Sequence, residues 1–189
     1  MYDVHETVYT LAVPEDHTYQ LKTVIVDSID NGNGTYNYVQ YHYKRSAEGQ
    51  NWVYDGTWSA QSDAREVVVN EANTLYLKYR FPLSEGYSWN GNTYNNLEED
   101  TYVMEGAKVS QTIDGHVYDD CLVINQHDNQ DFIVFLDQRI EIYGRGVGLL
   151  SKSVRQYHYC TETASGCLGQ QVIEEGLDYT QTLVSHGRE

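Results

Sequence analysis

The sequence has few basic residues: its 12 lysines and arginines are outnumbered by 28 acidic residues, which gives a formal net charge of −16 and a pI near 4.6. Such a chain lacks the basic surface that attracts nucleic-acid phosphates or anionic lipid. We therefore expect no nucleic-acid partner. The acidic excess suits a soluble surface, and cation binding is the alternative.

Long apolar runs are also missing. No stretch approaches the roughly 20 apolar residues of a membrane-spanning helix, so we expect no transmembrane segment. Residues 1–17 do not show the charged-then-apolar pattern of a signal peptide. With 189 residues, the chain is long enough to bury one substantial core, and no linker or low-complexity tract divides it.

Proline is rare, with two residues, whereas tyrosine is abundant, with 18. Tyrosine favours strands that have one solvated face. Alternating polar and apolar residues predict closely spaced strands and very little helix, with one short helical candidate at 59–67. The sequence therefore predicts an all-β single domain over 1–189, built as a curved antiparallel sheet that is barrel-like or a half-barrel; a β-sandwich is the alternative. The expected strands are 19–29, 35–45, 51–60, 65–70, 74–81, 97–106, 108–115, 116–126 and 128–144.

Two turns can be placed from local composition. The segment DNGNG (30–34) predicts a hairpin turn, because Asn and Gly tolerate positive φ. A tight turn is expected at the start of 128–144. The continuous apolar run Phe132 to Leu136 then predicts a strand that is covered on both faces.

Three glycines, Gly144, Gly146 and Gly148, occupy alternate positions in YGRGVGLLSKSV. Their spacing is one residue short of a dinucleotide-binding fingerprint, and the residues that follow alternate like a strand. Lys152 lacks the context of a phosphate-binding loop. We therefore assign these glycines a structural role in a bulge or sharp bend and expect no cofactor.

The three cysteines divide into a pair and a single residue. Cys160 and Cys167 bracket the short loop TETASG, which a disulfide could close; two free thiols are the alternative. A disulfide would favour an oxidising compartment. Cys121 stands alone in an alternating strand and is expected to be a buried thiol.

The runs FPLSEGYSWNGNTYN (81–95) and EIYGRGVGLLSKSV (141–154) resemble an uncharacterised group of Bacteroidetes-type secreted lipoproteins with a Glu-x-Tyr-x-x-Gly-Val-Gly-Leu signature. The resemblance covers about residues 75–157, and Leu150 and Arg145 depart from the usual pattern. It implies export to the periplasm, outer membrane or cell surface and a curved antiparallel fold. Lipid anchoring follows only if an N-terminal leader has been removed. It implies no catalytic residues.

No motif for catalysis or metal binding stands out. The Gly-x-Ser-x-Gly elbow of a serine hydrolase is absent. Glu141, in the signature, is the first carboxylate to inspect, but its expected role is structural, as an outward strand residue paired with Arg139, Arg145 or Lys152. His42 and His158 are expected on the sheet surface. We predict no metal site and regard an enzyme, a hydrolase with an unrecognised site, as the less favoured interpretation.

Aromatic residues offer candidate ligand contacts. Trp52, Tyr54 and Trp58 would share one face of a regular strand. Trp89 and Tyr87 lie in a polar segment, where an aromatic ring can grip a ligand or plug the core. The leading hypothesis is an exported, non-enzymatic domain that binds a protein, glycan or lipid-like ligand on a concave sheet. A structural protein that forms homo-oligomers through a sheet edge or face is the alternative.

Overall fold

The computed structural model describes residues 1–188, which form one antiparallel sheet of twelve strands. The part of the chain that is described contains no helix, and hence none long and apolar enough to cross a membrane. The strands are β1 (Tyr2–Tyr9), β2 (Glu15–Asp30), β3 (Tyr36–Arg45), β4 (Val53–Ser62), β5 (Glu66–Glu71), β6 (Thr74–Arg80), β7 (Ser88–Asn90), β8 (Thr101–Ile113), β9 (His116–Asp131), β10 (Phe135–Gly144), β11 (Gly148–Tyr159) and β12 (Ile173–Leu183).

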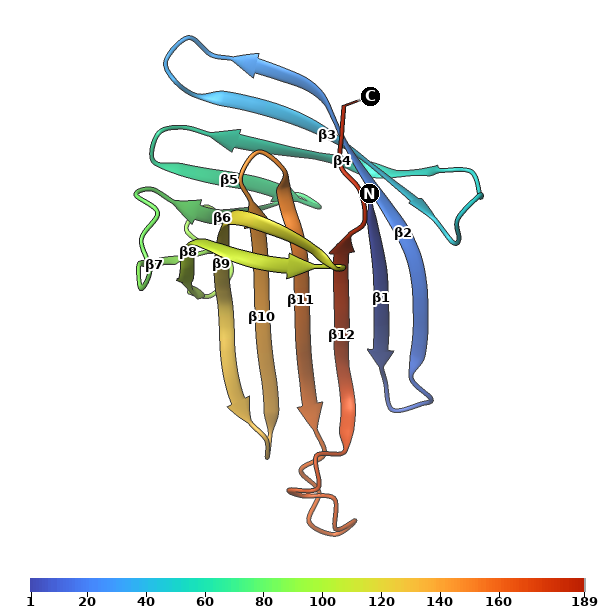
Figure 1. Ribbon diagram of the computed structural model, residues 1–189. Coiled ribbons are helices and arrows are strands. Elements are labelled where there is room, and N and C mark those ends of the chain that lie inside the picture. The colour runs from blue at the N-terminus through green and yellow to red at the C-terminus, as the bar shows by residue number, and fades with distance from the viewer. Residues whose placement is uncertain (189) are drawn as a thin grey trace.

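The chain starts in the middle of this sheet. Strands β1 to β6 run outward to one edge, the chain then crosses to β7 at the opposite edge, and β8 to β12 return until β12 pairs with β1. The strands β3 to β6 cross over the upper part of β9 to β12, so the sheet curls into a barrel (Figure 1). The prediction of an all-β, curved, barrel-like antiparallel sheet is confirmed, in place of a sandwich of two sheets.

The barrel is nearly closed, and its two edges meet at a seam between β6 and β7. Within residues 1–188 one backbone hydrogen bond crosses this seam, from Leu77 N to Gly91 O at 2.9 Å. The Trp89 indole adds a second contact by donating Nε1–H to Leu77 O at 2.9 Å. The seam therefore depends on side chains more than on strand pairing.

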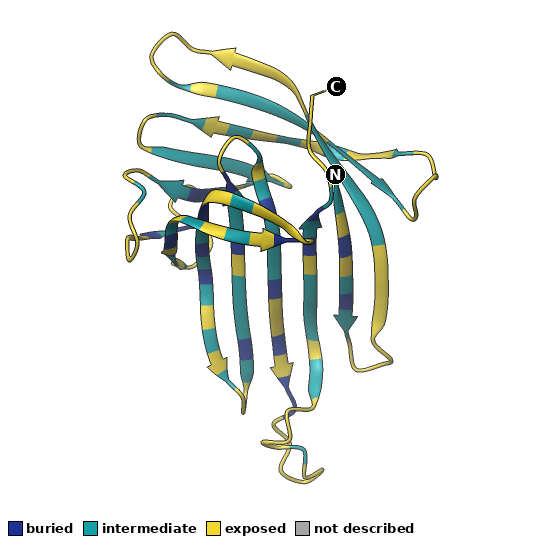
Figure 2. Ribbon diagram, in the orientation of Figure 1, coloured by how far each residue is buried: buried dark blue, intermediate teal, exposed yellow. Residues whose placement is uncertain are grey.

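Buried side chains gather in the barrel interior, where opposite parts of the curled sheet face each other. One cluster lies behind the seam, and Figure 2 shows further buried positions along β9 to β12 and β1. A second cluster contains Ile113, Cys121, Leu150 and Leu183. The seam cluster contains Leu77, Trp89, Tyr102, Met104, Leu122 and Ile124.

Below the barrel, the strands β9 to β12, β1 and β2 continue as an open sheet that ends in three loops (Figure 1). The turn between β9 and β10 lies here, at residues 132–134. The prediction of a doubly covered strand from Phe132 was wrong, because Phe132, Ile133 and Val134 form an exposed turn. The strand β9 runs through the expected turn at 128–131, because its pairing with β10 extends from Asp131 to Cys121, with one register shift between Arg139 and Ile140.

Two smaller expectations also differ from the structure. Residues 59–67, the short helical candidate, form the end of β4 and the start of β5, where strand pairing from Ser59 to Ser62 overrides local helix propensity. The strands expected at 97–106 and 108–115 are one strand, β8, whose pairing with β9 shifts register at three points. The sequence suggested a break between two strands near residue 107, but the structure has register shifts within one continuous strand.

The triple-glycine segment is the turn between β10 and β11. Gly146 and Gly148 take φ values of 72° and 100°, which L side chains rarely adopt, and Val147 N donates to Gly144 O at 3.1 Å. The turn rises to the level of β5 in Figure 1, and Val147, Gly148 and Leu149 line the barrel cavity. It therefore lies beside the barrel interior.

A glycine also permits the seam to close. A methyl group at Gly91 would overlap the ring of Tyr102, because the backbone of residue 91 lies directly under that ring. We expect Gly91→Ala to lower the free energy of unfolding by about 1–3 kcal/mol, because the ring or the seam must move. Urea unfolding followed by tryptophan fluorescence measures this, with Gly187→Ala, which meets no atom within 4 Å, as the control that leaves stability within about 0.5 kcal/mol. Equal stability of the two variants would contradict this account of the seam.

Candidate binding cavity inside the barrel

The barrel encloses a cavity of about 490 Å³. Its wall includes aliphatic side chains from β2, β5 and the start of β11, among them Leu21, Val67, Val69 and Leu149. Its other side is polar and charged. A cavity of this size with apolar walls and a few converging polar groups is typical of small-molecule sites.

Four charged side chains form the floor of the cavity, and we call them the Lys–Glu ring: Glu71, Lys78, Glu141 and Lys152. Lys78 Nζ lies 2.6 Å from Glu71 and 2.9 Å from Glu141, and it is buried. Lys152 Nζ lies 3.5 Å from Glu71 and 3.4 Å from Glu141. The ring joins the β5–β6 hairpin to the β10–β11 hairpin across the interior.

Strand register explains how the ring forms. Glu141 and Lys152 are direct cross-strand partners on β10 and β11, so their side chains share the inner face. The other oxygen of Glu141 accepts a hydrogen bond from the Tyr143 hydroxyl, two residues along the same strand. Lys78 projects from β6 on the opposite side of the barrel. Each carboxylate thus meets two ammonium groups.

Burial and pairing act in opposite directions on these groups. Burial alone would raise the pKa of Glu141, but Lys78 and Lys152 outweigh it and lower this pKa to about 2. Burial alone would lower the pKa of Lys78, but Glu141 and Glu71 outweigh it and raise this pKa. Burial and the Glu141 charge raise the pKa of Tyr143 well above its ordinary value. Lys78 and Glu141 are therefore charged, and Tyr143 is neutral, at neutral pH.

These shifts limit the chemistry of the ring. A carboxylate with a pKa near 2 is a poor general base at neutral pH, and an amine that stays protonated cannot act as a nucleophile. The ring is accordingly suited to holding structure and offering a fixed polar floor to a ligand.

At the rim of the cavity, a bulge in β4 changes which residues face inward. His42 on β3 pairs with Gly56 and the next residue, Tyr43, pairs with Tyr54, so Asp55 is the extra residue. Gly56 has a φ of 155°. Asp55 and Trp58 both line the cavity although they are three residues apart, which a regular strand would not allow.

At this rim, the Asp55 carboxylate and His42 Nε2 have no hydrogen-bond or ion-pair partner within residues 1–188. Asp55 forms no hydrogen bond or ion pair with any described residue, and it is exposed. His42 Nε2 is enclosed yet has no hydrogen-bond partner within 1–188, while Nδ1 lies 3.4 Å from Thr23 Oγ1. Burial lowers the pKa of His42, partly offset by Asp55 and Glu71. The imidazole is thus neutral at pH 7, and its ring lies 4.2 Å from that of Trp58.

The aromatic residues predicted to share a face do not do so. Trp58 lines the cavity, but Tyr54 is 56% exposed and contacts Tyr41 and Tyr43, and Trp52 packs against Arg45. The prediction was wrong because the bulge at Asp55 reverses the alternation between Tyr54 and Trp58. An isolated glycine inside a strand pattern, as in VYDGTW, is the signal that could have revealed it.

The second aromatic pair also lies away from the cavity. Trp89 is 5% exposed and packs in the seam cluster, so it acts as a plug of the core. Tyr87 remains 37% exposed, with its ring 6.1 Å from that of Trp89. Neither ring lines the cavity.

Glu141 and His42 were placed on the wrong face by the sequence. Glu141 is inward and 1% exposed, and of its expected partners it meets Lys152 but not Arg139 or Arg145. His42 lines the cavity, whereas His158 is exposed as expected. Glu71, Lys78 and Asp55 were missed, because no local pattern marks charged residues that meet only after the sheet curls.

None of the three cysteines lines this cavity. Cys160 and Cys167 form a disulfide in the loop between β11 and β12, at the lower end of Figure 1. Cys121 is a buried free cysteine, and burial raises the pKa of its thiol.

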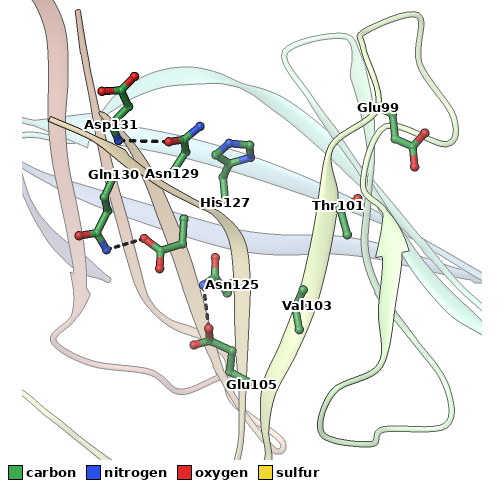
Figure 3. A pocket seen from close by; sticks show the side chains of 10 residues that line it. Glu99, Thr101, Val103, Glu105, Asn125, His127, Asn129, Gln130 and Asp131 are labelled. Carbon is green, nitrogen blue, oxygen red and sulfur yellow. Dashed lines mark hydrogen bonds between the residues drawn. The ribbon is translucent and has the colours of Figure 1, made fainter. Parts of the chain in front are cut away.

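A second, open recess of about 790 Å³ lies between β8 and the lower part of β9 (Figure 3). Its polar side chains mostly satisfy each other: Asn125 donates to Glu105 at 2.7 Å, and Gln130 donates to Asp128 at 2.8 Å. Nowhere in residues 1–188 do three or more His, Cys, Asp or Glu side chains form a group that could hold a metal ion. The larger recess is therefore the weaker candidate, because it is open to solvent and has little apolar wall.

No family model, curated protein or solved structure matches the chain, so the site is interpreted from its own geometry.

The depressed pKa of Glu141 predicts a loss of stability in acid. A carboxyl group whose pKa is about 2 in the folded protein, against an ordinary 4.5, stabilises the fold above pH 4.5 and loses that contribution as the pH falls toward 2. We expect Glu141→Gln to cost about 3–5 kcal/mol at pH 7, because it leaves Lys78 with one partner, and to show a shallower fall in acid than the wild type. Urea unfolding at pH 6 and pH 3 measures both effects, with the exposed Glu48→Gln as the control. If the free energy of unfolding fell equally with pH in wild type and Glu141→Gln, the predicted contribution of Glu141 to acid sensitivity would be refuted.

Proposed function

We propose that the protein is a non-enzymatic binding protein that holds a small, largely apolar molecule inside the half-closed barrel. The observation that carries this proposal is the cavity of about 490 Å³ that combines aliphatic walls with the Lys–Glu ring as its floor. Burying apolar ligand surface against such walls supplies affinity, and the few polar groups select orientation.

Binding is favoured over catalysis by the state of the ionisable groups. Glu141, Lys78 and Tyr143 have pKa values shifted away from neutrality, whereas acid–base catalysts need values near the working pH. A lipid-like or other apolar small molecule fits the cavity better than a protein or a glycan chain, because the site is an interior space and not an exposed surface.

Binding is also favoured over assembly through a sheet edge. Within the described chain, β2 before Gln20 has no strand partner on its outer side, and it carries Glu15 and Asp16. The part of β9 beyond Asn125 also lacks one, so it is a second free edge on which another chain could pair. It carries Asp128 and Asp131, and charged residues on a free edge discourage such pairing. These edges therefore support an assembly function less well than the cavity supports binding.

Inserting a large side chain into the cavity tests the proposal. We expect wild-type protein to bind the neutral fluorophore N-phenyl-1-naphthylamine, with enhanced emission, and Val69→Trp to weaken binding by roughly tenfold or more because the indole occupies the space. Val53→Trp, at a 66% exposed position on β4, is the matched control and should bind normally. Circular dichroism checks that both variants are folded, and Ala60→Leu gives a smaller filling step. Unchanged binding in folded Val69→Trp would place the probe outside the barrel.

We further propose that the protein works in an oxidising, extracytoplasmic compartment of the cell envelope. The disulfide between Cys160 and Cys167 supports this, because such bonds persist outside the reducing cytosol.

Thiol counting tests the compartment. Protein recovered from its native compartment and alkylated under denaturing conditions should carry one modified cysteine, Cys121, because the other two are joined. Prior reduction is the control and should give three. Intact mass spectrometry reads the count, and three alkylated cysteines without reduction would contradict an oxidising location.

A further inference from the structure

The charges around the cavity do not balance. Three carboxylates, Asp55, Glu71 and Glu141, face two ammonium groups, Lys78 and Lys152. Both ammonium groups are committed to the Lys–Glu ring, in which each lies within 3.5 Å of two carboxylates. The unpaired charge of the lining is therefore negative, and it is located on Asp55.

The surroundings of Asp55 are suited to a cation. Nearby, Lys44 lies with its Nζ 3.5 Å from the ring centroid of Tyr19 and makes no ion pair with Asp55 in residues 1–188. Asp55 shares the cavity lining with the rings of Tyr19, His42 and Trp58. Aromatic faces attract cations as well as apolar groups.

His42 is a second reason to expect a ligand with a hydrogen-bond donor near Asp55. Its Nε2 atom is enclosed next to the cavity but has no hydrogen-bond partner in the described chain. In the tautomer in which Nδ1–H donates to Thr23 Oγ1, Nε2 is an acceptor. An N–H donor that enters beside Asp55 would satisfy it, and buried polar atoms in native proteins are nearly always satisfied.

The long-range field acts in the same direction. A formal net charge of −16 attracts cations and repels anions at every approach to the barrel. An anionic ligand such as a fatty acid would meet this field and then find both ammonium groups already paired.

We propose that the cavity ligand is an organic amine: an apolar or aromatic body within the barrel and a protonated amino group at the rim, held by the Asp55 carboxylate. This inference rests on the proposed binding function and names the class of its ligand. The ammonium group donates to Asp55 and, where it reaches, to His42, while the body lies against Val67, Val69 and Leu149.

Three probes that share one body separate the charge from the apolar contact: 4-phenylbutylamine, 4-phenylbutanol and 4-phenylbutyrate. Calorimetry or ligand-observed NMR at pH 7 and low salt gives their dissociation constants. We expect the amine to bind about tenfold tighter than the alcohol, and the carboxylate to bind most weakly, because one charge-assisted hydrogen bond distinguishes them.

Variants locate the effect. Asp55→Asn should remove most of the preference for the amine and leave the alcohol unchanged. Asp27→Asn, an exposed carboxylate on neighbouring β2 that is not part of the lining, makes the same change in net charge and should keep the preference. Equal losses in the two variants would attribute the preference to the overall field and overturn the role of Asp55.

The remaining outcomes distinguish the two proposals. If the alcohol or the carboxylate binds at least as tightly as the amine, the amine inference is wrong and the barrel still binds apolar molecules. If none of the three probes binds and N-phenyl-1-naphthylamine does not bind either, the binding function itself fails. A preference for the amine that survives in Asp55→Asn would also overturn the inference.

Discussion

The buried contact between Lys78 and Glu141 is the interaction on which the closure of this barrel depends. The two residues lie 63 positions apart and on opposite sides of the interior, and they meet at 2.9 Å. Taking both charges out of water is costly, and pairing offsets that cost only where geometry is good and the remaining donors and acceptors are satisfied. Glu71, Lys152 and Tyr143 supply those extra partners. The same four charges that fix how far the sheet curls also form the floor of the cavity, so shape and site have a common origin.

Departures from regular strand geometry shape the site as much as the strands do. The bulge at Asp55 turns a carboxylate toward the interior and leaves Tyr54 outside. The glycine turn brings Val147 and Leu149 to the cavity wall. The Gly91 backbone allows the Tyr102 ring to lie against the seam. In a sheet, one inserted residue reverses the direction of every side chain that follows, so small local changes decide what a ligand would meet.

The strand content and the curvature could be predicted from the sequence because alternation and turn residues are local signals. The hairpin at 30–34 and the bend at Gly144 to Gly148 belong to this class. The site could not be predicted in the same way. Lys78 sits in an ordinary alternating strand, and its partners are contributed by β5 and β10, which only sheet closure brings near. The prediction of a covered strand from Phe132 failed for a related reason. An apolar run is typical of a covered strand, but here the pairing of β9 with β10 places Phe132 to Val134 at a turn.

The weak seam has a consequence for how the molecule opens. Most neighbouring strands are joined by a long ladder, for example β9 to β10 from Asp131 to Cys121, whereas in the described chain one backbone hydrogen bond, from Leu77 in β6 to Gly91 just after β7, crosses the seam. Parting there breaks the fewest backbone hydrogen bonds, so amide protons of Leu77 and of the residues beside it should exchange with solvent ahead of those in β10 and β11. Such local opening would separate β6 from β7 while the hydrogen-bond ladders between the other strands stay intact. A molecule too bulky to enter at the rim could then reach the cavity through a transient opening between β6 and β7.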